Sequence, residues 1–301
     1  MKFLRTPDER FRNLPGYPFS AHYVDVPDGD GSVLRMHYVD EGPRDAPVVL
    51  LLHGEPSWSY LYRKMIPPLA EAGLRAVAPD LIGFGKSDKP IDRSDYTYAR
   101  HVGWVWSFVE RTELRDVTLF CQDWGSLIGL RVAAEHPQQF ARIAIGNGGL
   151  PTGGQQMSEA FLAWRQFSQE TPTFPVGAII DRGCASDLST EVVAAYDAPF
   201  PDETFKTGAR AFPALVPVSP DDPAAAANRA AWEVLKRWDK PLLTLFSDKD
   251  PITRGGERIL QDLVPGAKGQ PHRIVRDAAH FLQEDKGEEL AAALIDFVRS
   301  Q

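Results

Sequence analysis

Features that mark several other classes of protein are scarce in this sequence. Two cysteines in 301 residues, Cys121 and Cys184, cannot build a disulfide framework or a four-ligand zinc site. No apolar run approaches the roughly 18 residues that a membrane helix needs. The charged N-terminal segment also lacks the apolar stretch of a signal peptide. We therefore expect a soluble, cytoplasmic protein without a bound metal.

Basic residues are outnumbered by acidic ones, with 33 Lys and Arg against 41 Asp and Glu, a net charge of −8. Nucleic acids and anionic membranes attract basic surfaces, and the chain has no dense basic run, so neither is an expected partner. Hydrophobic residues make up 43% and charged residues 25% of the chain, which is typical of folded globular proteins and argues against disorder.

Short apolar, β-branched runs alternate with amphipathic segments along most of the chain. The runs predict buried strands and the amphipathic segments predict helices. The expected strands are residues 48–53, 75–80, 117–122, 143–147, 242–247 and 273–276, with an antiparallel start at 23–27 and 33–39. The expected helices are residues 57–71, 99–111, 124–136 and 288–299. This alternation predicts an α/β fold, a mostly parallel sheet with helices on both faces.

Residues 150–239 interrupt the alternation. The stretch has helix-like aromatic patches and many Pro and Gly residues, and it contains no apolar strand. We expect it to form a helical cap domain over the crevice at the carboxyl ends of the strands, where ligands bind in open α/β sheets. The core domain then consists of residues 1–149 and 240–301.

The strand at 117–122 leads into Asp123, Trp124 and Gly125 and then into a helix. This is the context of a nucleophile elbow, with Asp where serine hydrolases have Ser, and the chain contains no G-x-S-x-G motif. A carboxylate is ionised at neutral pH without a base, and it can displace a leaving group from a saturated carbon to form an ester. The alternative is that Asp123 only caps the following helix.

A base and an acid are expected later in the chain, because enzymes with this elbow carry nucleophile, acid and histidine in that order. His280 follows the predicted strand at 273–276 and is the candidate base, the alternative being a surface-turn histidine. Asp250 and Asp248 both follow the strand at 242–247. We favour Asp250, just before the bend at Pro251, and regard Asp248 as a solvated loop charge.

Four segments together resemble the haloalkane dehalogenases of the α/β-hydrolase fold. They are residues 53–63 (HGEPSWSYLYR), 80–88 (DLIGFGKSD), 122–125 (QDWG) and 277–284 (DAAHFLQE). The likeness extends over nearly the whole chain, although single motifs are shared with epoxide hydrolases. In combination with Trp164 in the cap, they look like the subfamily with an Asp–His–Asp triad and two halide-binding tryptophans.

This resemblance implies roles for further residues. The indole N–H groups of Trp124 and Trp164 would hold the halide, since an indole donates and never accepts a hydrogen bond. The backbone N–H groups of Glu55 and Trp124 would form the oxyanion hole. The side chain of Glu55 would be either protonated or hydrogen-bonded to water. The implied pocket positions are Phe161, Phe212, Pro213, Val216, Leu127 and Ile252.

Haloalkane dehalogenation is therefore the predicted activity: a haloalkane and water give an alcohol, a chloride or bromide ion and a proton, through an ester on Asp123. An aliphatic pocket fits a short haloalkane, and we expect a monomer without cofactor.

An epoxide hydrolase would use the same triad but normally two cap tyrosines, and the cap contains only Tyr196. A fluoroacetate dehalogenase would have Arg in place of Trp124. An inactive scaffold would lack a triad member.

Overall fold

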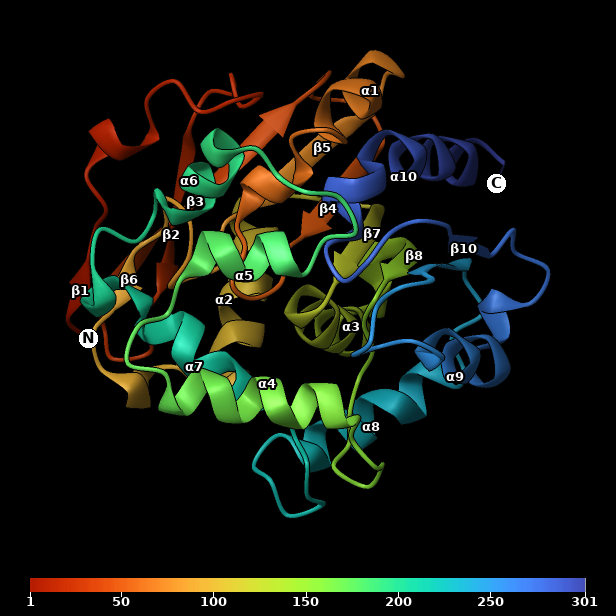
Figure 1. Ribbon diagram of the computed structural model, residues 1–301. Coiled ribbons are helices and arrows are strands. Elements are labelled where there is room, and N and C mark those ends of the chain that lie inside the picture. Colours follow the sequence, from red (N-terminus) through yellow and green to blue (C-terminus); the bar gives the residue numbers. More distant parts are fainter. Residues whose placement is uncertain (301) are drawn as a thin grey trace.

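The central feature of the computed structural model, which describes residues 1–300, is an eight-stranded sheet in the order β10-β9-β8-β7-β4-β5-β3-β2 (Figure 1). Its strands are β2 (His22–Pro27), β3 (Val33–Glu41), β4 (Val48–Leu52), β5 (Arg75–Pro79), β7 (Val117–Gln122), β8 (Phe140–Gly146), β9 (Leu242–Ser247) and β10 (Arg273–Val275). All neighbours pair in parallel except β2 with β3 and β3 with β5. The predicted mostly parallel sheet with an antiparallel start is confirmed.

Every residue of β4 and β7 is buried, because helices cover both faces of the sheet at its centre. The covering helices are α1 (Ile66–Glu71), α2 (Tyr98–Arg111), α3 (Trp124–Glu135), α9 (Gly256–Leu263) and α10 (Leu282–Arg299). Helices α1 and α10 pack against each other on one face, and α2 and α3 do so on the other (Figure 1). The α/β-hydrolase prediction matches this layered arrangement.

Between β8 and β9 the chain forms helices joined by loops, without a strand. These are α4 (Glu159–Glu170), α5 (Val176–Arg182), α6 (Thr190–Asp197), α7 (Thr207–Leu215) and α8 (Ala225–Leu235). Helix α8 packs on the core helix α3, where Arg131 donates a hydrogen bond of 3.0 Å to Asn228. The division into a core and a cap at residues 150 and 239 stays a prediction, and the position of α8 favours ending the cap before this helix.

Two predicted helices differ from the structure at their first turns. The helix expected at 57–71 is a short 3-10 turn, Ser59–Tyr62, followed by α1, because Pro67 and Pro68 lack N–H groups and are tolerated only in a first helical turn. The helix expected at 288–299 begins earlier, at Leu282, and passes through a kink at Lys286 that interrupts the apolar period.

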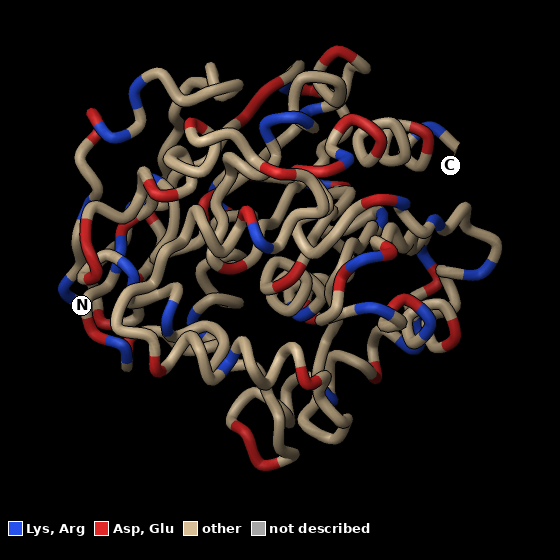
Figure 2. The backbone as a smooth tube through the Cα atoms, in the orientation of Figure 1, with Lys and Arg blue, Asp and Glu red and all other residues tan. Residues whose placement is uncertain are grey.

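Smaller elements complete the fold. Residues Phe3–Leu4 (β1) and Lys89–Pro90 (β6) form a two-stranded antiparallel sheet that the sequence did not predict. The remaining 3-10 turns are Asp8–Phe11, Arg93–Asp95, Pro137–Gln139, Glu203–Lys206 and Pro265–Ala267. None of the helices within residues 1–300 has the length and apolar character to cross a bilayer. Acidic and basic positions are interspersed along the chain (Figure 2).

Candidate active site

Asp123 lies at the turn between β7 and α3, with φ of 50° and ψ of −128°. Residues other than glycine rarely adopt a positive φ, and such strain is found at functional sites. Space is also restricted, because a Cβ atom on Gly54 would lie 2.2 Å from Oδ1 of Asp123, and one on Gly125 would lie 2.0 Å from the carbonyl oxygen of Leu52. Although Asp123 occupies the cap position of α3, its side chain makes no capping hydrogen bond.

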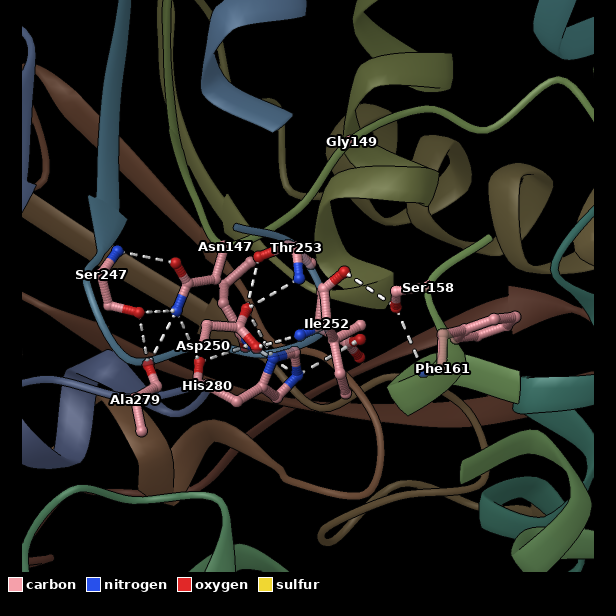
Figure 3. Close-up of polar contacts among 12 residues, drawn as sticks. Asn147, Gly149, Ser158, Phe161, Ser247, Asp250, Ile252, Thr253, Ala279 and His280 are labelled. Carbon is pink, nitrogen blue, oxygen red and sulfur yellow. Dashed lines mark hydrogen bonds and ion pairs between the residues drawn. The ribbon is translucent and has the colours of Figure 1, made fainter. Parts of the chain in front are cut away.

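Three side chains from separate loops form a line of contacts. Nδ1 of His280 lies 3.1 Å from Oδ2 of Asp250, and Nε2 of His280 lies 3.5 Å from Oδ2 of Asp123. Figure 3 shows His280 beside Asp250. Asp248 lies elsewhere, with a carboxylate oxygen 3.7 Å from Arg276. The structure thus brings Asp123, His280 and Asp250 together and separates Asp248 from them.

The charges of this triad are coupled. Burial alone would raise the pKa of Asp250, but His280 and the donors of Thr253 and Ile252 lower it to about 2. Burial alone would lower the pKa of His280, but the negative charges and hydrogen bonds of Asp250 and Asp123 raise it to about 10. The imidazole is therefore cationic while both carboxylates are charged.

Two amide side chains, for which the sequence pattern predicted no role, hold the loop that carries His280. Asn147 donates hydrogen bonds to the carbonyl oxygens of Ala279 (2.8 Å) and His280 (3.1 Å) and exchanges hydrogen bonds with Ser247 (Figure 3). Nε2 of Gln122 donates to the carbonyl oxygen of His280 at 3.1 Å. Their position at the carboxyl ends of β7 and β8 was the available signal, because parallel strand ends converge on the site.

One backbone donor holds the carboxylate of Asp123. The N–H of Glu55 donates to Oδ1 of Asp123 at 2.7 Å. The N–H of Trp124 is the first of α3, and the first four N–H groups of a helix have no partner within it. The structure thus places the N–H of Glu55 against Asp123, while the role of the Trp124 N–H in an oxyanion hole stays a prediction.

Both tryptophans of the predicted halide site line one cavity with Asp123 and His280. Trp124 is buried, and its ring centroid lies 5.1 Å from that of Tyr98. Trp164 comes from α4 in the cap. Trp232 also lines the cavity, but its ring N–H donates to the carbonyl oxygen of Leu150 at 2.8 Å and is already engaged.

Five of the six predicted pocket residues line this cavity: Phe161, Pro213, Val216, Leu127 and Ile252. The sixth, Phe212, is fully buried against Trp124, with ring centroids 4.5 Å apart, and is not among the residues that line the cavity, so its place in the pocket stays a prediction. Successive residues of a helix differ in direction by about 100°, so Phe212 and its neighbour Pro213 face different surroundings.

Comparison with known proteins shows where this chain belongs. The alpha/beta hydrolase fold family matches residues 47–287. A haloalkane dehalogenase of Psychrobacter cryohalolentis is 60% identical over 99% of this chain and 98% of its own length, and one of Mycobacterium marinum is 57% identical over 99% and 100%. The solved structure of haloalkane dehalogenase DpaA from Paraglaciecola agarilytica, described as tetrameric, is 36% identical with a TM-score of 0.89 and covers 97% of both chains.

The chain belongs to the haloalkane dehalogenases.

As a member of the haloalkane dehalogenases, it is a hydrolase that acts on carbon–halogen bonds. The alternative of an epoxide hydrolase gains no support from these relatives. An epoxide hydrolase would also need a tyrosine to protonate the epoxide oxygen. Tyr196 is fully buried, is not among the cavity-lining residues and donates its hydroxyl to Glu284.

The cavity of this haloalkane dehalogenase has a volume of about 1580 Å³, above the roughly 300–1,000 Å³ of common small-molecule sites. It extends from Asp123 to the exposed apolar side chains of Ile259 and Leu263 on α9. A short haloalkane, as the sequence suggested, would occupy only part of this space.

Proposed function

We propose that Asp123, His280 and Asp250 carry out the dehalogenation in two chemical steps, through an alkyl ester on Asp123. The observation that supports this best is the line of contacts from Asp250 through His280 to Asp123, beside an apolar cavity that Trp124 and Trp164 also line. Each side chain has a charge or hydrogen-bonding capacity that suits one step.

In the first step a carboxylate oxygen of Asp123 forms a bond to the substrate carbon while the carbon–halogen bond breaks. Oδ1 is held by the N–H of Glu55 at 2.7 Å, which favours Oδ2 as the attacking atom. The halide leaves with the bonding electron pair. The ring N–H groups of Trp124 and Trp164 stabilise this charge, because donors aimed at a developing anion lower the barrier most in a site shielded from water.

In the second step water hydrolyses the ester. His280 takes one proton from the water, and the hydroxide oxygen attacks the ester carbonyl carbon of Asp123. The negative charge that develops on Oδ1 is stabilised by the N–H groups of Glu55 and Trp124. The bond between the carbonyl carbon and the alkoxy oxygen then breaks, and the new carboxyl group gives its proton to the alkoxide, which leaves as the alcohol. The restored carboxylate of Asp123 keeps His280 protonated, as in the free enzyme.

The order of these steps follows from the charges. In the free enzyme the carboxylate of Asp123 helps to raise the pKa of His280 to about 10. Formation of the ester removes that charge, so the pKa of His280 falls and the imidazole loses its proton to solvent, which is the one proton that the reaction releases. A neutral imidazole beside the new ester is the base that the second step requires, while Asp250 orients it and stabilises its charged form.

Trapping of the ester tests this proposal. The variant His280→Ala, mixed with 1,2-dibromoethane, is expected to gain the mass of a bromoethyl group and to release about one bromide per enzyme, because only the second step needs the base. The double variant Asp123→Asn/His280→Ala is the matched control and should gain no mass. An unchanged mass of His280→Ala, or hydrolysis of styrene oxide by the wild-type enzyme at a comparable rate, would contradict it.

Two further expectations from the sequence stay predictions, the monomeric state and the cytoplasmic location. The tetramer described for the DpaA structure is a property of that relative. Light scattering of the purified chain measures the molar mass directly, and 33.4 kDa is the value for a monomer.

A further inference from the structure

The side chain of Glu55 has no task in the two proposed steps, which use only its backbone N–H. Glu55 is 3% exposed, and its Oε1 atom is buried without a hydrogen-bond partner among residues 1–300. The same residue lines the cavity with Asp123, Trp124 and Trp164. A buried polar atom without a partner costs free energy, so this carboxyl group favours a ligand in the cavity that can pair with it.

The charges around Glu55 decide its protonation. Asp123 faces it from the turn after β7, His280 from the loop before α10, and the indole N–H of Trp164 from α4. Burial, and then the negative charge of Asp123, raise the pKa of Glu55 well above its ordinary value, and His280 and Trp164 oppose this rise only in part. This shift favours the neutral carboxylic acid, which has one O–H donor and one carbonyl acceptor.

A neutral carboxylic acid beside Trp164 matches the needs of a halide ion. Halide ions accept hydrogen bonds and donate none, and two of the cavity groups named above, the indole N–H groups, donate only. An ionised Glu55 would have the opposite effect, because it would compete with the halide for the N–H of Trp164 and repel an anion beside it.

We propose that the side chain of Glu55 is a third hydrogen-bond donor for the departing halide, in addition to the ring N–H groups of Trp124 and Trp164. This inference rests on the proposed function of the site. The proton stays on Glu55, because hydrogen halides are far stronger acids than carboxylic acids. Glu55 therefore stabilises the departing ion through its O–H group without becoming part of the proton balance of the reaction.

The test measures the dissociation constant of bromide in the absence of turnover, with tryptophan fluorescence as the signal. It compares the wild-type enzyme with two variants from pH 7 to pH 10. Glu55→Gln keeps a donor but cannot ionise, and Glu55→Met has a similar length without a donor. Glu233→Gln, whose side chain is 66% exposed, removes a carboxylate from the cavity rim and is the matched control.

At pH 7 we expect Glu55→Gln to bind bromide within about threefold of wild type and Glu55→Met about tenfold more weakly, as for loss of a hydrogen bond to an ion. As the pH is raised, the wild-type dissociation constant should rise relative to that of Glu55→Gln wherever Glu55 ionises, because only wild type gains a charge at this position. Glu233→Gln should follow wild type throughout.

Two results would overturn the inference. They are wild-type affinity in a folded Glu55→Met enzyme, and a tenfold gain in affinity of Glu55→Gln at pH 7, which would mean that Glu55 is already ionised. If Glu55→Met does not fold, the ratio between wild type and Glu55→Gln still decides. A wild-type enzyme that binds no bromide at any pH would instead remove the halide site itself, and with it this part of the proposed function.

Discussion

The hydroxyl of Tyr196 in α6 donates a hydrogen bond to the carboxylate of Glu284 at the start of α10, and this bond joins the helical insertion to the core. Glu284 also forms a buried ion pair with Arg63. Burial alone would raise the pKa of Glu284, but Arg63 holds it below its ordinary value, so the acceptor is charged. The same bond directs Tyr196 away from the cavity.

We expect Tyr196→Phe to lower the free energy of unfolding by about 1–3 kcal/mol, because a buried hydrogen bond to a charged group is lost, and to retain dehalogenase activity. Urea unfolding and bromide release measure the two effects. Tyr23→Phe, at a side chain that is 37% exposed, is the control for stability. Loss of activity in a Tyr196→Phe enzyme that remains folded would show that this hydroxyl takes part in the reaction.

We expect Trp164→Phe to weaken bromide binding by about tenfold or more, because one hydrogen bond to the anion is lost while most of the ring remains. Trp232→Phe is the matched control, since its ring N–H is already bonded to the carbonyl oxygen of Leu150. Bromide titration of both variants measures the difference. Equal affinities would exclude Trp164 from the halide site.

Asp250→Asn is expected to slow hydrolysis of the ester by about 100-fold or more, because His280 loses the negative charge that stabilises its protonated form. Asp248→Asn should leave the rate close to that of wild type, because Asp248 contacts Arg276 instead. Rapid mixing should then show a fast first release of bromide by Asp250→Asn, followed by slow turnover. A defect confined to Asp248→Asn would reverse the choice between these two aspartates.

Asp250 should also contribute to stability in a pH-dependent way. Its pKa is about 2 in the folded protein and 3.8 as the ordinary value, so the folded state favours the charged form. The resulting stabilisation, about 2 kcal/mol, is present above pH 4 and is lost as the pH falls towards 2. The difference in unfolding free energy between wild type and Asp250→Asn should therefore shrink as the pH falls from 5 towards 2. A constant difference would show that the pKa of Asp250 is not lowered.

Much of the sheet and the members of the triad could be predicted from local sequence patterns. Continuous apolar runs mark parallel strands covered on both faces, as in β4 and β7, and each triad residue follows a predicted strand. First helical turns were harder to predict, because Pro67 and Pro68 postpone the start of α1 while the apolar pattern already begins before them.

The sequence by itself determined the chemistry available to this protein: an aspartate at a strand–helix turn, a late histidine and aspartate, and two tryptophans able to donate to an anion. Only the tertiary structure decided which groups meet. It placed Asp250 and not Asp248 against His280, packed Phe212 against Trp124, engaged Trp232 and Tyr196 elsewhere, and brought Glu55 beside Asp123. The reason is physical. The type of a residue defines which hydrogen bonds its side chain can donate or accept, whereas its charge and its actual partners depend on burial and on residues far away in the chain.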